Sequence, residues 1–189
     1  AKHYGFNNFP SSLPIGNNLN NVGNYWKVRS YFIDKLSNLN FHEIQSLSFV
    51  DDSLNNLFNP ELESVKVLNP IDKTQESMRT NLFSTLINTY LFNQDKHSYS
   101  GKYFEINNTY NKAKHKKYES IPNQSYNLGI LLPKLLSDKD SKKNTIQDLS
   151  SLLRVLIPNI EFKKLSKPGF HKNNSYLVTL NGKPVGHMG

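Results

Sequence analysis

Apolar residues recur every three or four positions in three stretches of the chain, which is the spacing of one helix face. The first stretch begins near Asn24 and carries Tyr25, Val28, Phe32, Leu36 and Leu39. The second has Asp72 or Thr74 as its N-cap and carries Leu82, Leu86, Ile87, Tyr90 and Leu91. The third runs from Thr145, its N-cap, to Ile157, and Pro158 ends it. The pattern therefore predicts three amphipathic helices.

Elsewhere the period falls to two, which is typical of strands with one buried face. A short strand closed by Asn-Pro is predicted at Val65–Pro70, and Asn-Gly marks a hairpin turn within Asn181–Gly186. We expect 102–110 and 126–133 to pair in an antiparallel manner. Together these patterns predict an α+β fold, a largely antiparallel sheet flanked by helices. The other predicted strands are Phe41–Val50, Lys102–Tyr110, Tyr126–Pro133, Ile160–Lys164 and Ser175–Leu180.

The length of 189 residues and the hydrophobic content of 37% suit one fairly large domain or two small ones. Cysteine is absent, which excludes disulfides and thiolate metal sites. No apolar run approaches the ~20 residues that span a bilayer, and no signal peptide is visible. We therefore expect a cytoplasmic protein without a membrane partner. Both ends of the pattern are abrupt, which favours a piece of a longer polypeptide.

The net charge of +8 favours polyanionic partners, but the basic residues are spread along the chain with one local cluster, "KAKHKK" at 112–117. One interpretation of this cluster is a solvated turn between two strands. The other is a nucleic-acid contact through Lys112, Lys114, Lys116 and Lys117. The first is favoured, because no aromatic residues alternate with the lysines.

Candidates for chemistry are few. The chain has no phosphate-binding glycine loop and no His pair at zinc spacing. Asp51 and Asp52 are adjacent and are expected to diverge, which favours a capping or solvated role over a metal site. His171 could be a general base, but a lone histidine in a loop is more often structural. The sequence predicts neither a catalytic residue nor a metal site.

Glu105 is a carboxylate inside an apolar strand and therefore needs a partner. Arg79, in the N-terminal part of the predicted second helix, is an available cation. A buried structural ion pair between Arg79 and Glu105 is favoured over a catalytic pair.

An ordered set of segments carries a family resemblance. "YGFNNFP", "VRSYFIDKLSNLNFHEIQSLSFV", "VKVLNPIDKTQESMRTNLF", "FEI" and "NGKPVGHMG" resemble the catalytic-core-like module of bacterial phenylalanyl-tRNA synthetase β subunits, over nearly the whole chain. The resemblance implies that residues 1–16 are the tail end of a preceding small domain. It also implies that 17–189 are a class II synthetase-like core module, truncated at its C-terminal side. The family's acidic magnesium-binding segment would lie before Ala1, so no metal ligands are assigned.

The resemblance implies a non-catalytic module that supports the catalytic α subunit in an α2β2 complex with tRNA. The whole enzyme consumes ATP with magnesium, and this piece is expected to hold no cofactor. Residues 24–50 match the class II dimerisation motif, which makes Tyr25, Val28 and Phe32 candidate interface residues. Burial of the same face in the domain's own core remains an equal alternative.

The number and positions of the arginines agree with a module that lacks catalytic residues. Class II enzymes hold ATP phosphates with two arginines, and lysine lacks the bidentate fork of that side chain. Neither "KYFEINNTY" nor "VGHMG" contains an arginine; the chain has arginines only at 29, 79 and 154. Two other hypotheses stay open: a basic tRNA- or RNA-binding module, and a residual ATP site of class II type.

Overall fold

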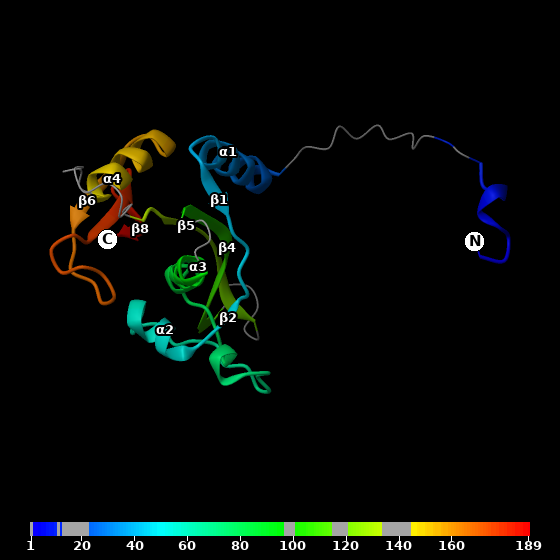
Figure 1. Cartoon of the computed structure of the whole chain (residues 1–189), viewed down its shortest axis with the longest axis horizontal. Coiled ribbons are helices and arrows are strands. Elements are labelled where there is room, and N and C mark those ends of the chain that lie inside the picture. The colour runs from blue at the N-terminus through cyan, green and yellow to red at the C-terminus, as the bar shows by residue number, and fades with distance from the viewer. Residues whose placement is uncertain (1, 11, 13–22, 97–100, 115–120, 134–144) are drawn as a thin grey trace.

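The computed structural model describes residues 2–10, 12, 23–96, 101–114, 121–133 and 145–189 (Figure 1). Four α-helices and eight strands are described, and strands that are consecutive in sequence pair in an antiparallel manner in β4–β5 and β6–β7–β8. The helical elements are η1 (Phe6–Asn8), α1 (Asn24–Asn38), α2 (Asp52–Phe58), η2 (Lys73–Gln75), α3 (Phe83–Asp95) and α4 (Thr145–Leu156). The strands are β1 (Phe41–Glu43), β2 (Phe49–Val50), β3 (Ser77–Met78), β4 (Lys102–Lys114), β5 (Pro122–Leu131), β6 (Ile160–Lys164), β7 (Tyr176–Leu180) and β8 (Lys183–Met188).

The described strands form three sheets, with orders β1-β4-β5, β2-β3 and β6-β7-β8. Pairing is antiparallel in every sheet except between β1 and β4, which run parallel. The antiparallel pairing of β4 with β5 is confirmed, and so is the α+β class.

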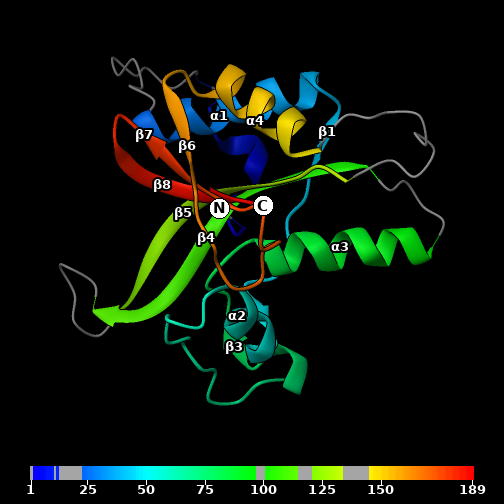
Figure 2. The same cartoon turned by 90° about the vertical axis from the view of Figure 1, so that its left-hand side faces the viewer.

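Helices cover both faces of the β4–β5 sheet (Figure 2). On one face, Leu36 of α1 and Leu156 of α4 pack against Phe104 of β4, and all three side chains are buried. On the other face, Leu82 and Leu86 at the start of α3 pack against Tyr103. Alternate residues of one strand thus feed two separate cores, as the pleat of a strand dictates.

The predicted strand 41–50 is wrong as a single element. Its two ends pair in different sheets, as β1 and β2, and residues 44–48 between them are irregular. The reason is a buried carboxylate: the main-chain N–H and the hydroxyl of Ser46 both bond to Glu105. A side chain therefore takes the hydrogen bonds that a strand ladder would have used.

The second helix begins later than the cap residues predicted. Asp72 does cap a helical turn, because it accepts a hydrogen bond from Thr74 N at 3.0 Å, but that turn is the three-residue η2. The chain then enters β3, so Arg79 follows a strand instead of lying in a helix, and α3 starts at Phe83. The predicted strand 65–70 is reduced to one bridge between Lys66 and Ser77.

The C-terminal part follows its predicted pattern, with α4 packed on the β6–β7–β8 sheet. Asn181 and Gly182 adopt φ angles of 49° and 77°, which a two-residue hairpin turn requires. The β6–β7 loop packs against α2. Phe170 of the loop lies edge-on to Phe58 of α2, with ring centroids 5.9 Å apart. At Gly169, where φ is +78°, an added Cβ would lie 2.6 Å from the Phe58 ring.

No helix in the described parts of the chain combines the length and the apolar character needed to cross a bilayer.

Candidate functional site

The apolar stripe of α1 divides between the core and the surface. Leu36 is fully buried, and Phe32 is half-buried and packs against the same core. Val28 is 55% exposed and Tyr25 is 36% exposed. The N-terminal half of α1 therefore presents apolar side chains outward, whereas its C-terminal half holds the helix on the sheet.

Two aromatic residues extend this exposed face, although neither is among the periodic apolar positions predicted for the first helix. Trp26 is 57% exposed and lies edge-on to Tyr25, with ring centroids 5.1 Å apart. Tyr126 of β5 contacts Tyr25 from a distant part of the sequence, at 4.5 Å between centroids. Burial and the neighbouring Tyr126 raise the pKa of the Tyr25 phenol. We call Tyr25, Trp26, Val28 and Tyr126 the α1 aromatic patch.

The structure brings Arg79 and Glu105 together in the core. Arg79 Nη1 lies 2.9 Å from Glu105 Oε1, and their side chains are 0% and 1% exposed. Arg79 Nε also donates to the carbonyl of Asn108 at 2.9 Å, and Nη1 donates to Ser46 Oγ at 2.7 Å. One buried guanidinium therefore ties the end of β3 to β4 and to the irregular segment after β1.

Glu105 is satisfied by several donors, while Arg79 is not. The carboxylate accepts bonds from Ser46 and Asn107 as well as from the arginine, and from Thr85 Oγ1 at 3.3 Å. Arg79 Nη2 has no hydrogen-bond partner in the described parts of the chain. Because both groups are sealed from solvent, the network can orient three elements, but it offers no surface to a dissolved substrate.

Asp51 and Asp52 diverge as predicted and have different roles. Asp51 caps α2 by accepting a bond from Ser53 N at 2.8 Å. Asp52 accepts bonds from the hydroxyls of Ser64 and Ser77 and lies 3.0 Å from Lys66 Nζ. These interactions, with the Ser64 hydrogen bond foremost, lower the pKa of Asp52 to about 2.

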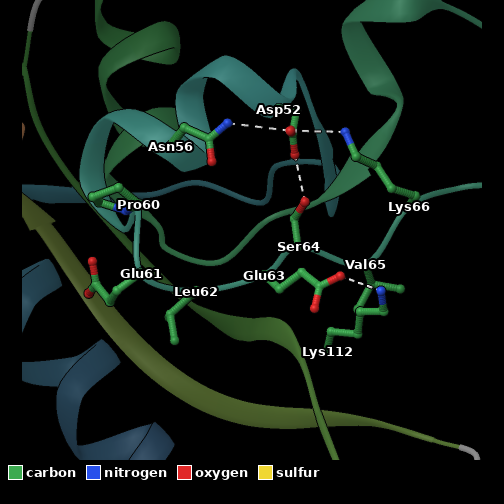
Figure 3. Close-up of a pocket in the computed structure, with 10 residues that line it drawn as sticks. All are labelled: Asp52, Asn56, Pro60, Glu61, Leu62, Glu63, Ser64, Val65, Lys66 and Lys112. Carbon is green, nitrogen blue, oxygen red and sulfur yellow. Dashed lines mark hydrogen bonds and ion pairs between the residues drawn. The ribbon is translucent and has the colours of Figure 1, made fainter.

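Asp52 lies at the edge of a cleft of about 590 Å³ between α2, the following loop and β4 (Figure 3). The carboxylates here are paired with lysines, since Glu63 bonds to Lys112 and Asp52 to Lys66. The cleft therefore has a mixed charge without a strong field of either sign. The described residues contain no group of three or more His, Cys, Asp or Glu side chains that could hold a metal ion.

Of the four lysines in the predicted nucleic-acid contact, the structure places two. Lys112 lies in β4 beside the cleft and pairs with Glu63, and Lys114 is the last residue of β4. Lys116 and Lys117 lie outside the described residues. His171 is exposed and its Nδ1 accepts a bond from Asn173 N at 3.2 Å, within its own loop.

Each of the three arginines already has a partner. Arg29 bonds to Glu43 at 2.6 Å on the surface, Arg79 is buried with Glu105, and the guanidinium of Arg154 lies 5.5 Å from the centre of the Phe162 ring. Arg79 is closed off by burial and Arg29 is bound to a carboxylate, whereas Arg154 is exposed and its contact with the Phe162 ring does not use its N–H donors.

The fold has counterparts among solved structures. Two solved structures of a pyrrolysyl-tRNA synthetase from Desulfitobacterium hafniense match 87% and 85% of this chain and 55% and 57% of theirs, each with a TM-score of 0.58 and 14% identity. At that identity the likeness concerns the fold alone. The architecture is that of the class II aminoacyl-tRNA synthetase core.

The sequence gives the particular family. Residues 9–189 match the model of the phenylalanyl-tRNA synthetase β chain CLM domain, and the chain belongs to this family. The phenylalanine–tRNA ligase β subunits of Hahella chejuensis and Aliivibrio fischeri are 27% and 26% identical over 79% and 98% of the chain. That of Aquifex aeolicus is 26% identical over 90%. The chain spans 19%, 24% and 22% of these three relatives.

Proposed function

We propose that this chain is a non-catalytic, core-like module of a phenylalanyl-tRNA synthetase β subunit. It supports a catalytic α subunit in an α2β2 complex that ligates phenylalanine to its tRNA in the cytoplasm. Membership of the CLM domain family over residues 9–189 supports this proposal.

The observation that carries the supporting role is the α1 aromatic patch. Trp26 and Val28 are each more than half exposed on a helix whose other face is anchored in the core. Tyrosine and tryptophan are enriched in the buried centres of protein interfaces. Of the predicted interface residues, Tyr25 and Val28 belong to this patch, and Phe32 supports it from the core side.

The arginine geometry supports the non-catalytic part of the proposal. ATP recognition of the class II type needs arginine forks, and here Arg29 and Arg79 are bound to carboxylates. We therefore assign the use of ATP and magnesium to the α subunit of the complex.

Assembly of the whole β chain with its α subunit tests the proposal. In light scattering after size exclusion, the double variant Trp26→Ala and Val28→Asp should lose the mixed complex. Val155→Asp is the matched control, because Val155 is also an exposed apolar helix residue, on α4. A double variant that assembles like the parent would remove the α1 aromatic patch as the docking surface.

A second candidate function is direct contact with tRNA through the β4–β5 hairpin. The hairpin extends away from the helices (Figure 2), and Lys112 and Lys114 lie in its outer half. A projecting basic hairpin suits a phosphate backbone, and salt dependence distinguishes this candidate from the first.

A further inference from the structure

Two aliphatic side chains of one short loop are almost completely exposed. Leu68 and Ile71 are 97% and 99% exposed, whereas the next most exposed large apolar side chain of the described residues, Val155, is 70% exposed. They lie in the loop that runs from the bridge at Lys66 to η2. We call residues 68–71 the apolar tip. Exposed apolar side chains that stand together mark sites of interaction with another molecule or domain.

The apolar tip is held at its base by hydrogen bonds and ion pairs. Val67 N donates to the carbonyl of Glu76 at 2.9 Å, which closes the loop. Lys66 Nζ lies 3.0 Å from Asp52 Oδ2 and 3.6 Å from Glu76 Oε1. Within the tip, Pro70 has a fixed φ and restricts the residue before it. A loop that is already ordered loses little conformational entropy when it binds.

The charges around the apolar tip favour a protein partner. Residues 66–76 carry two cations, Lys66 and Lys73, and two anions, Asp72 and Glu76. Binding to RNA or to an anionic membrane surface depends on an excess of cations, and this segment has none. The surface that fits the tip is therefore an apolar pocket on a folded protein domain.

A shallow groove of about 420 Å³ extends the surface from the apolar tip towards β2. Thr74 and Gln75 of η2, which follow the tip in sequence, form part of its wall. Leu47 and Phe49 also line it, and they are 63% and 42% exposed. A domain that receives the tip can therefore cover further apolar area beside it.

We propose that the apolar tip inserts into an apolar pocket of another domain of the same β polypeptide, outside residues 1–189. β3 and the loop before it lie at the opposite end of the molecule from α1 (Figure 1, Figure 2), so the tip is separate from the α1 aromatic patch. The chain spans only 19–25% of the first four curated β subunits it matches, so most of such a polypeptide lies in other domains. A covalently linked domain binds at a high effective concentration. This inference rests on family membership and not on the proposed role toward the α subunit.

Hydroxyl-radical footprinting of the full parent β chain, with and without its α subunit, tests the proposal, because the radical oxidises leucine and isoleucine side chains that contact solvent. In both samples Leu68 and Ile71 should be oxidised at least about tenfold more slowly than in the urea-unfolded chain, like the buried Leu36. Leu68→Asp should restore the oxidation of Ile71, because an apolar pocket excludes an unpaired carboxylate. Ser125→Asp is the matched control, since it adds the same charge at an exposed position of β5 and should leave Ile71 protected.

Four results would overturn the proposal. Oxidation of Leu68 and Ile71 at the rate of the unfolded chain in both samples would show that nothing covers the apolar tip. Protection that appears only with the α subunit would assign the contact to that subunit, and protection that is lost on dilution of the β chain would assign it to a second copy. If Ile71 stays protected in Leu68→Asp, the tip does not occupy an apolar pocket. The assembly experiment measures separately whether the α1 aromatic patch binds the α subunit.

Discussion

Arg79 and Glu105 show how burial determines the stability that is lost when one partner of an ion pair is removed. Replacing Arg79 by Ala should lower the free energy of unfolding by about 3–5 kcal/mol, because Glu105 would remain charged in the core without its cation. Arg29→Ala is the matched control, since Arg29 bonds to Glu43 at 2.6 Å but both side chains are about a quarter exposed. There we expect a loss of only ~0.2–1 kcal/mol. Urea denaturation measures both losses, and equal losses would contradict this account.

Asp52 makes stability depend on acid. Its pKa is about 2 in the folded chain and 3.8 ordinarily, so the stabilisation is complete above pH 4 and is lost as the pH falls towards 2. After allowance for the 24% exposure of the side chain, we expect a loss of about 1–2 kcal/mol over this range. Asp52→Asn should flatten this part of the pH profile of unfolding.

Ser64→Ala provides the complementary test at the same site. It removes the hydrogen bond that contributes most to the low pKa of Asp52, so that pKa should rise towards its ordinary value, and the acid-dependent loss of stability should be smaller and end at a higher pH than in the parent. If Asp52→Asn and the parent lose the same stability between pH 4 and pH 2, another carboxylate is responsible.

Single residues differed in how far the sequence could place them. A carboxylate in an apolar strand needs a cation. The chain has only three arginines, so Arg79 could be chosen from few candidates as the partner of Glu105. Trp26 and Tyr126 could not be assigned to a common patch in this way. Trp26 is off the helical stripe, and Tyr126 reaches Tyr25 only because β5 passes beside α1 in the folded chain.

At the scale of elements, the contact between α3 and β5 depends on one missing side chain. A Cβ on Gly129 would lie 2.6 Å from Leu86 Cδ1 and 2.9 Å from Leu82 Cβ. Gly129→Ala should therefore cost about 1–3 kcal/mol through overpacking. Ser125→Ala on an exposed position of the same strand should change stability by less than about 0.5 kcal/mol. Thermal unfolding of the two variants measures the difference. If Gly129→Ala leaves the melting temperature unchanged, α3 can shift to make room for the added methyl group at little cost in stability.

Long elements were predictable and short ones were not. α1, α4, β4 and β5 have enough periodic residues to be recognised from their own sequence. β2 and β3 have two residues each and exist because they pair with each other, some 27 residues apart. The prediction of one strand over β1 and β2 was wrong for the same reason. The segment between them is irregular because Ser46 bonds to Glu105, which is far along the chain.

For the whole molecule, the family resemblance supplied what local patterns could not, namely the class II architecture and the hypothesis that α1 lies at a subunit interface. Local patterns in turn supplied what the resemblance did not, including the ion pair in the core. The structure adds that two sheets are separated by an apolar groove, which no periodicity within a single segment could indicate.

The net charge of +8 also belongs to the whole molecule, and its effect on RNA binding can be separated by position. If the β4–β5 hairpin contacts tRNA, replacing Lys112, Lys114, Lys116 and Lys117 together by Ala should weaken binding. It should also flatten the slope of log K against log salt by about 3, because up to four phosphate contacts are lost.

A control of equal charge is available in the C-terminal sheet and its loop. Lys163, Lys164, Lys172 and Lys183 are all exposed, and replacing these four by Ala removes the same charge far from the hairpin along the chain. If both sets of replacements flatten the slope equally, the attraction comes from the general charge of the molecule and the hairpin is not a specific contact. If neither changes it, neither set of lysines contacts tRNA, and the second candidate function is wrong.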